Sequence, residues 1–144
     1  MFEKLAGTLP SDCRIVLVGT DEAVRSRLPE NIIAIDRTGN QQELAEIYSA
    51  ADVFVNATRE DTFPTVNIEA LACGTPVVTF DTGGSGEIID DSCGIKVKKN
   101  DISAIEKAII HIKENRAFTQ ESCRSRASLF DMNDKFREYV DNYK

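Results

Sequence analysis

The stretch "DVFVNATREDTFPTVNIEALACGTPVVTF", residues 52–80, decides the fold class. Two short runs rich in β-branched residues, 52–56 and 76–80, enclose a segment, 62–73, with the composition of a buried helix. Short apolar runs of this kind suit strands that are covered on both faces of a parallel sheet. Thr62 is the predicted N-cap, and Pro64 is tolerated in a first helical turn. The stretch therefore predicts a βαβ unit with a right-handed crossover.

The same alternation extends in both directions along the chain. Further strands are predicted at 14–19, 31–35 and 94–98, and further helices at 41–50, 101–116, 118–129 and 133–143. Helix 101–116 carries isoleucines three or four residues apart, and Asp101 is its predicted N-cap. The pattern predicts one α/β domain over residues 1–144, a Rossmann-like three-layer fold around a parallel sheet.

Composition excludes several classes of function. The formal net charge of -7 argues against a broad nucleic-acid surface. The first thirteen residues show no basic leader with an apolar core, so a cytoplasmic location is expected. The four cysteines have no metal-site spacing and are expected to be reduced, structural thiols: Cys13, Cys73, Cys93 and Cys123. We expect neither a metal nor a cofactor.

The chemistry-bearing residues gather around helix 62–73. Its free N-terminal amides would form an anion site at the carboxyl ends of the strands. Glu69 follows Thr62 by seven residues, about two turns or roughly 10 Å, which suits a diol about one sugar away from a phosphate. Asp61, at the mouth of the helix, could bind hydroxyls on the other side. This spacing of hydroxyl, phosphate and hydroxyl sites matches a nucleotide sugar.

Each of these residues also has a plainer interpretation. Asp61 could cap the helix, and Glu69 could be an ordinary exposed helical glutamate. Gly83 and Gly84 are more often turn residues than ligand contacts, although their glycine character would allow a ligand to approach the backbone closely. His111 lies far from the motif and has no nucleophile beside it, so no catalytic role is expected for it.

A family resemblance supports the functional interpretation. The segment "DTFPTVNIEALACGTPVVTFDTGGSGEII", residues 61–89, resembles the donor-binding signature of retaining glycosyltransferases of family 4, which have the GT-B fold. That signature has two acids with seven residues between them, as Asp61 and Glu69 have, and ends in a Gly-Gly pair followed by a glutamate. The upstream segment "LAEIYSAADVFVNAT", residues 44–58, is similar as well, so the resemblance covers essentially the whole chain.

The resemblance implies roles for individual residues. Glu69 would bind the ribose hydroxyls, and Asp61 would contact the donor sugar. The loop and helix start that would meet sugar and phosphate comprise Phe63, Pro64, Thr65 and Val66; the turn that would meet the base contains Arg37 and Thr38, and the glycine pair is Gly83 and Gly84. The first acid departs from the pattern, because the family usually has Glu there. Glu60 stands beside Asp61 as an alternative, with a spacing of eight.

A larger departure concerns completeness. GT-B enzymes have two Rossmann-like domains, and this chain resembles only the C-terminal, donor-binding one, without its first strand and the basic turn after it. That strand would lie between strands 14–19 and 52–56. Without it, either the flanking strands pair directly or a segment of another copy fills the gap, so self-association is expected. Helix 133–143 would add a second apolar face with Phe136, Tyr139, Val140 and Tyr143.

The implied activity is a retaining transfer of a sugar from a nucleotide-diphosphate sugar to a glycan or lipid-linked acceptor. It needs no protein nucleophile, and bacterial surface polysaccharide synthesis is the expected setting, in the cytoplasm or peripherally at a membrane. The fragment alone is expected to be inactive, because the acceptor-binding domain is absent. A stand-alone nucleotide-sugar-binding module is the main alternative, and an epimerase or phosphorylase of the same fold is a weaker one.

Overall fold

The computed structural model describes residues 1–130, so the predicted helix 133–143 and its apolar residues lie outside the described part. The strands are β1 (Ile15–Val18), β2 (Ile32–Ile35), β3 (Phe54–Asn56), β4 (Val77–Phe80) and β5 (Gly94–Val97). The helices are α1 (Phe2–Thr8), α2 (Glu22–Arg25), α3 (Gln41–Ala50), α4 (Thr65–Ala72), α5 (Ser85–Ile88), α6 (Ile102–Asn115) and α7 (Gln120–Ser128). Every predicted strand is present, each one or two residues shorter than predicted.

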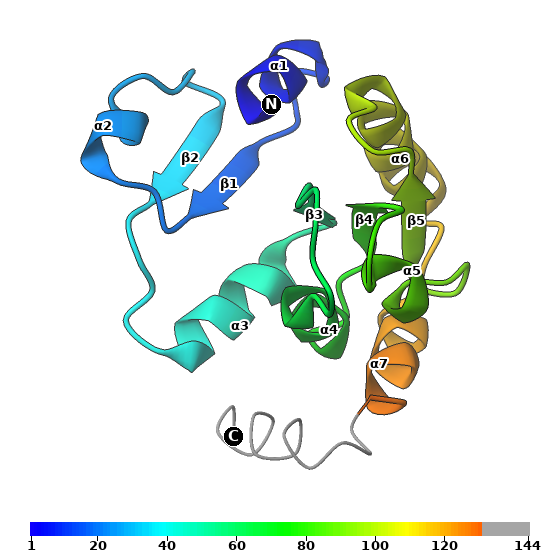
Figure 1. Ribbon diagram of the computed structural model, residues 1–144. Coiled ribbons are helices and arrows are strands. Elements are labelled where there is room, and N and C mark those ends of the chain that lie inside the picture. The colour runs from blue at the N-terminus through cyan, green and yellow to red at the C-terminus, as the bar shows by residue number, and fades with distance from the viewer. Residues whose placement is uncertain (131–144) are drawn as a thin grey trace.

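All strand pairs are parallel, which confirms the predicted α/β class. The strands do not form one continuous sheet, however, and the interruption lies between β1 and β3, where the first strand was predicted to be missing. The strands form a two-stranded sheet, β1-β2, and a three-stranded sheet, β3-β4-β5 (Figure 1). Because β1 and β3 are not paired, the strands on either side of the proposed gap do not close up. The alternative, in which another copy fills the gap, stays a prediction.

The three-stranded sheet lies between two layers of helices, as predicted. Side chains alternate along a strand, and adjacent residues of β4 therefore face opposite layers. Val77 packs in a cluster with residues of α3, α4 and α7, whereas Val78 packs in a second cluster with residues of α1 and α6. Both valines are fully buried. The main core of the described chain is thus built around β4.

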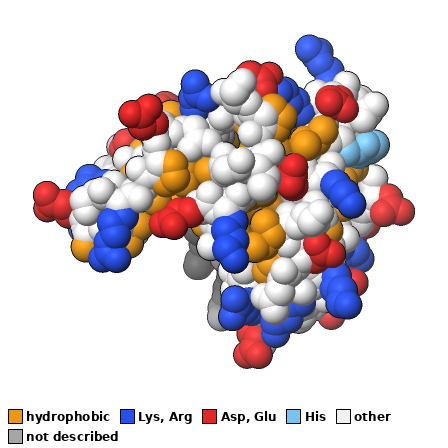
Figure 2. All heavy atoms as spheres, turned by 90° about the horizontal axis from the view of Figure 1, so that it is seen from above, with side chains coloured by type: hydrophobic (Ala, Val, Ile, Leu, Met, Phe, Trp, Pro, Cys, Tyr) orange, Lys and Arg blue, Asp and Glu red, His pale blue; other side chains and the backbone are white. Residues whose placement is uncertain are grey.

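The two-stranded sheet is much less covered. Val16 and Val18 of β1 and Ile33 of β2 are all exposed, and α2 contributes no buried residue. Figure 2 shows this part projecting to the left of the molecule, with acidic and basic side chains interspersed over the face in view. No helix within residues 1–130 has both the length and the apolar character needed to cross a membrane.

Helix ends follow from local sequence. Asp101 caps α6 as predicted, because its side chain accepts a hydrogen bond from the Ala104 N–H at 2.9 Å. The prediction that Thr62 caps α4 is wrong: α4 begins at Thr65, and its N-cap position is Pro64. A proline disfavours helical backbone at the residue before it, so Phe63 stays outside the helix and the start moves downstream.

Candidate functional site

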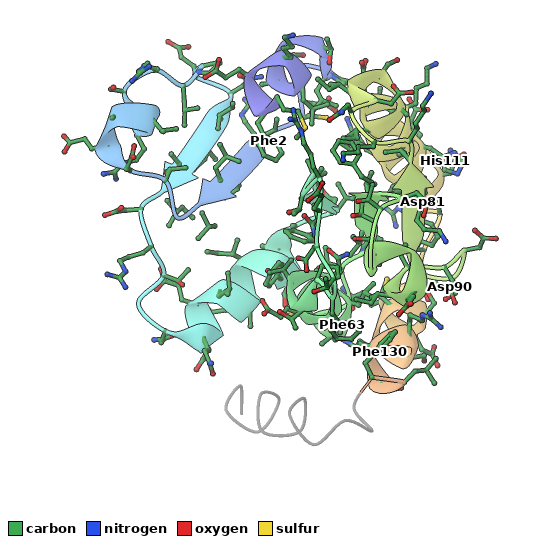
Figure 3. The ribbon with its side chains drawn as sticks, in the orientation of Figure 1. Phe2, Phe63, Asp81, Asp90, His111 and Phe130 are labelled. Carbon is green, nitrogen blue, oxygen red and sulfur yellow. The ribbon has the colours of Figure 1, made fainter. Side chains whose placement is uncertain are left out.

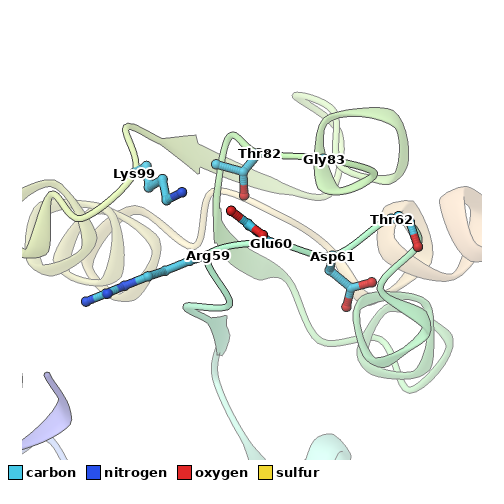
Figure 4. A pocket seen from close by; sticks show the side chains of 7 residues that line it. All are labelled: Arg59, Glu60, Asp61, Thr62, Thr82, Gly83 and Lys99. Atoms are coloured by element: carbon cyan, nitrogen blue, oxygen red, sulfur yellow. The ribbon is translucent and has the colours of Figure 1, made fainter.

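The carboxyl ends of β3, β4 and β5 meet at one edge of the three-stranded sheet, and an open pocket of about 660 Å³ lies between the loops that follow them. Ligands of open parallel sheets bind at such edges. The loop after β3 contributes most of the lining, and the loops after β4 and β5 contribute the rest (Figure 4). The lining residues are Arg59, Glu60, Asp61, Thr62, Thr82, Gly83 and Lys99.

The glycine pair holds two of these loops together. A Cβ on Gly83 would lie 2.1 Å from the Asp61 carbonyl oxygen, and one on Gly84 would lie 2.1 Å from the Thr62 carbonyl oxygen. Gly83 also has a backbone φ of +52°, a conformation that residues with a side chain rarely adopt. The Gly84 N–H donates to the Asp61 carbonyl at 2.9 Å. The close approach shown by the structure is therefore between two backbone segments, and contact of either glycine with a ligand stays a prediction.

Asp61 lines the pocket and does not cap α4. Its Oδ1 accepts a hydrogen bond from the Phe63 N–H at 3.1 Å, which closes a small turn ahead of the helix. The alternative interpretation of Asp61 as a helix cap is therefore wrong. The start of α4 has no side-chain cap, although the Asn67 N–H in its first turn donates to the Pro64 carbonyl at 3.0 Å. Anion binding at this helix start stays a prediction. Glu60 lines the same pocket beside Asp61.

Glu69 lies about one turn into α4 and outside the pocket lining. It is half-buried, in contrast to the exposed glutamate of the plainer interpretation. The Tyr48 hydroxyl donates to Glu69 Oε2 at 3.2 Å. Tyr48 is itself buried and packs edge-on against Phe54 of β3, with ring centroids 5.3 Å apart. This contact holds the Glu69 carboxylate in a defined position on the helix.

A buried polar network, missed at the sequence level, lies beneath the pocket. The Asn56 side-chain amide donates to Asn67 Oδ1 at 2.9 Å, which ties the end of β3 to α4. The Thr79 hydroxyl donates to the Asn56 carbonyl at 3.0 Å and lies 3.4 Å from the Ser85 hydroxyl. Polar side chains at the end of an otherwise apolar strand were the available signal, because such residues are rarely buried without a partner. The network fixes α4 and α5 relative to the sheet.

The remaining predicted ligand residues are spread more widely. Phe63, Thr65 and Val66 are exposed at the start of α4, whereas Pro64 is buried. The Phe63 ring packs edge-on against the Phe130 ring, with ring centroids 6.1 Å apart. Figure 3 shows the two residues close together near α4. His111 points outward from α6, on another side of the molecule (Figure 3).

The predicted base-binding residues lie in the other part of the molecule. Arg37 and Thr38 follow β2, at the carboxyl end of the two-stranded sheet. Neither residue lines the pocket after β3, β4 and β5. The structure therefore does not bring these residues together with Asp61, and their contact with a base stays a prediction.

The described residues hold no group of three side chains suited to a metal ion. Burial raises the pKa of the Cys93 thiol and raises that of Cys123 to about 11. Burial likewise raises the pKa of Cys73. These thiols stay protonated near neutral pH, which makes them poor nucleophiles and fits the structural role predicted for them.

A family model described as glycosyl transferases group 1 matches residues 1–115. The chain is 40% identical over 91 residues to a GDP-mannose-dependent alpha-mannosyltransferase of Mycobacterium tuberculosis (strain CDC 1551 / Oshkosh), a match covering 60% of this chain and 24% of that protein. It is 26% identical over 127 residues to an N-acetyl-alpha-D-glucosaminyl L-malate synthase of Bacillus anthracis, covering 83% and 33%. A D-inositol 3-phosphate glycosyltransferase of Saccharomonospora viridis is 32% identical over 107 residues, covering 72% and 25%.

Solved structures share the fold. The Anabaena protein Alr3699/HepE, in complex with UDP-glucose, superposes with a TM-score of 0.77 at 18% identity, covering 96% of this chain and 43% of that one. Sucrose-phosphate synthase from Thermosynechococcus elongatus superposes with a TM-score of 0.69 at 24% identity, covering 96% and 48%. The chain thus spans less than half of these structures and about a quarter to a third of the three curated relatives.

Proposed function

This chain belongs to the glycosyl transferases group 1 family, and we propose that it is the donor-binding part of a retaining glycosyltransferase of family 4. In this proposal the carboxyl edge of β3-β4-β5 binds a nucleotide-diphosphate sugar. The whole protein transfers the sugar to a glycan or lipid-linked acceptor. Because the chain spans only part of its relatives, transfer is proposed for a protein that contains an acceptor-binding domain as well.

One arrangement carries the proposal: two carboxylates flank the uncapped start of α4. The N–H groups of that start, which receive no side-chain cap, suit the diphosphate. Glu69, oriented by Tyr48, suits the ribose hydroxyls, and Asp61, on the pocket, suits hydroxyls of the sugar. Carboxylate oxygens accept hydrogen bonds from a pair of adjacent hydroxyls. One similar protein is described as GDP-mannose-dependent, and another was solved in complex with UDP-glucose; both support a nucleotide-sugar donor.

The proposed reaction breaks the bond between the sugar C1 and the β-phosphate oxygen, and the electron pair leaves with the diphosphate. The acceptor hydroxyl oxygen bonds to C1 on the same face, and its proton passes to the leaving diphosphate. In this scheme the residues of this chain orient the donor and stabilise charge, and none acts as a nucleophile. Bacterial surface polysaccharide synthesis, in the cytoplasm or peripherally at a membrane, is the proposed setting.

A thermal-shift panel tests the donor part of the proposal. UDP, GDP and ADP, with their glucose or mannose conjugates, would be added to the 144-residue chain. At least one nucleoside diphosphate is expected to raise the melting temperature, because a ligand that binds only the folded state stabilises it. Absence of any shift across the panel contradicts donor binding.

A transfer assay separates the enzyme from its alternative, the stand-alone binding module. The 144-residue chain is expected to bind donor without transferring sugar, because domain closure builds the reaction geometry. The same residues joined to an acceptor-binding domain are expected to transfer it. Donor binding without transfer in that longer protein would favour the module, and transfer by the chain alone would contradict the division into two parts.

We also propose that the 144-residue chain self-associates through the inner edges of its two sheets. β1 and β3 each pair on one side only, and a second pocket of about 580 Å³ lies beside β3, with Phe2, Val55 and Phe80 in its lining. A strand from a second copy would satisfy the unpaired backbone groups and cover these side chains. Sedimentation is expected to show mass rising with concentration, and a strict, heat-stable monomer would contradict it.

A further inference from the structure

We infer that Arg59 and Lys99 form an oxyanion subsite that holds a phosphate group of the acceptor, beyond the donor sugar. This inference rests on the proposed function, which places the donor sugar at Asp61. The sequence alone favours a solvated turn for the segment 96–101 that contains Lys99, and it assigns neither cation to a site. The two residues come from different loops, after β3 and after β5, and both line this pocket, while Arg59 also lines the second pocket, beside β3.

Their position in the pocket argues against the donor diphosphate as the ligand. Figure 4 shows Arg59 and Lys99 at one end of the pocket, Asp61 and Thr62 toward the other, and Glu60 and Thr82 between them. The start of α4, the proposed diphosphate site, follows Thr62 at that second end. An anion bound by the two cations therefore lies on the far side of Asp61 from α4. In a transfer reaction the acceptor approaches the sugar from outside the donor.

Both cations are available to a ligand. Arg59 and Lys99 are exposed, and the ion pairs of residues 1–130 are Lys113–Asp12 and Arg126–Asp90, so neither pocket cation is engaged in one. A guanidinium offers a planar fork of N–H donors that matches a phosphate, and an ammonium offers a compact charge. The hydroxyl of Thr82 lies with Glu60 between the cations and Asp61, as an uncharged donor (Figure 4).

The mixture of charges in one pocket fits a ligand with hydroxyls and an anion. Asp61 at one end and Glu60 in the middle of the pocket repel a bare anion but accept hydrogen bonds from sugar hydroxyls. Arg59 and Lys99 at the other end offset that repulsion locally, although the chain as a whole carries -7. A phosphorylated polyol that presents a hydroxyl toward Asp61 and its phosphate toward the cations satisfies both ends.

The experiment titrates the 144-residue chain with inorganic phosphate at constant ionic strength. Binding is measured from the NMR chemical shifts of the Gly83 and Lys99 backbone amides. The double variant Arg59→Gln with Lys99→Gln is compared with wild type and with Lys98→Gln, a neighbouring exposed cation outside the pocket lining. We expect saturable shifts in wild type and in Lys98→Gln. In the double variant the affinity is expected to fall about threefold to tenfold, since exposed charge pairs contribute modestly.

Further arms identify the source of the anion. With a saturating nucleoside diphosphate bound, phosphate is expected to bind as before, and the double variant is expected to bind that nucleotide as wild type does. Loss of the phosphate-induced shifts at Gly83 and Lys99 when nucleotide is bound, or weaker nucleotide binding by the double variant, would assign the cations to the donor diphosphate. A wild-type preference for UDP-glucuronic acid over UDP-glucose that the double variant loses would assign them to a donor carboxylate. Either result overturns the inference.

The two levels of proposal fail separately. If no nucleotide binds while phosphate still binds through Arg59 and Lys99, the proposed function fails and the subsite remains as a phosphate site. If nucleotides bind but phosphate produces no saturable shift at Gly83 and Lys99, or shifts that the double variant retains, the subsite is wrong and donor binding stands.

Discussion

The two sheets of this molecule differ in how completely they are covered. In β4, with a partner strand on each side and helices on both faces, all four residues are buried. In β1, which pairs only with β2, exposed residues alternate with half-buried ones, and Val16 is 44% exposed. A strand at the centre of a sheet makes contacts in four directions, whereas β1 lacks at least two of them. The loops that line the pocket therefore follow strands of the buried, three-stranded sheet, whereas Arg37 and Thr38 follow a strand of the exposed, two-stranded sheet.

The largest effect is expected at the glycine pair of the well-supported part. Gly84→Ala places a Cβ against the Thr62 carbonyl, a backbone atom that cannot move aside as a flexible side chain can. We expect a loss of about 3 kcal/mol in the free energy of unfolding, at the upper end for overpacking, together with loss of nucleotide binding. Urea denaturation measures the first and calorimetry the second.

Gly7→Ala is the matched control, because no atom lies within 4 Å of a Cβ at that helical position. It is expected to be neutral or to stabilise the chain by about 0.5–1 kcal/mol, since alanine is the better helix former. Equal effects of the two substitutions would show that the two loops are not held against each other as the structure has them.

The contrast between sheets is tested directly by one substitution made in each. Val78→Ala in β4 removes two buried carbons, and we expect it to lower the free energy of unfolding by about 2 kcal/mol. Val16→Ala in β1 should change it by less than about 0.5 kcal/mol, because that residue is 44% exposed and loses little buried area. If Val16→Ala costs as much as Val78→Ala, then β1 is covered in solution, as a second copy would cover it.

A small effect, on nucleotide affinity rather than on stability, is expected at Tyr48→Phe, on α3, which connects the two sheets. The variant keeps the ring that packs on Phe54 and loses the hydroxyl that donates to Glu69. We expect nucleotide affinity to fall about twofold to fivefold, equivalent to roughly 0.5–1 kcal/mol, because the carboxylate loses one orienting donor. Unchanged nucleotide affinity in calorimetry would show that Glu69 needs no orientation by this residue.

The elements followed closely from local sequence. β-branched runs placed all five strands, and α3 begins and ends at the predicted residues, because hydrophobic spacing determines which segments can be covered. The start of α4 was misplaced by three residues, since the effect of Pro64 on the residue before it outweighed the capping preference of Thr62.

Contacts between distant segments were harder to foresee. The division into two sheets falls at the predicted gap between strands 14–19 and 52–56, and the family resemblance indicated it rather than the pattern of any one strand. Gly83 approaches Asp61, which is 22 residues away in the chain. Arg59 and Lys99, which are 40 residues apart, line the same pocket. The Asn56–Asn67 bond likewise forms only once α4 has packed on β3. Local patterns predict elements, and packing of the elements creates the site.

The central claim, that the acids flanking α4 bind a nucleotide sugar, is tested most directly by calorimetric titration of Glu69→Ala with the nucleoside diphosphate that stabilises the wild-type chain. Glu114→Ala, an exposed glutamate on α6, is the control. We predict that Glu69→Ala loses about 1–3 kcal/mol of binding free energy, because ribose hydroxyls lose a charged acceptor, while the control binds as wild type does. Equal affinities of Glu69→Ala and wild type would contradict the claim.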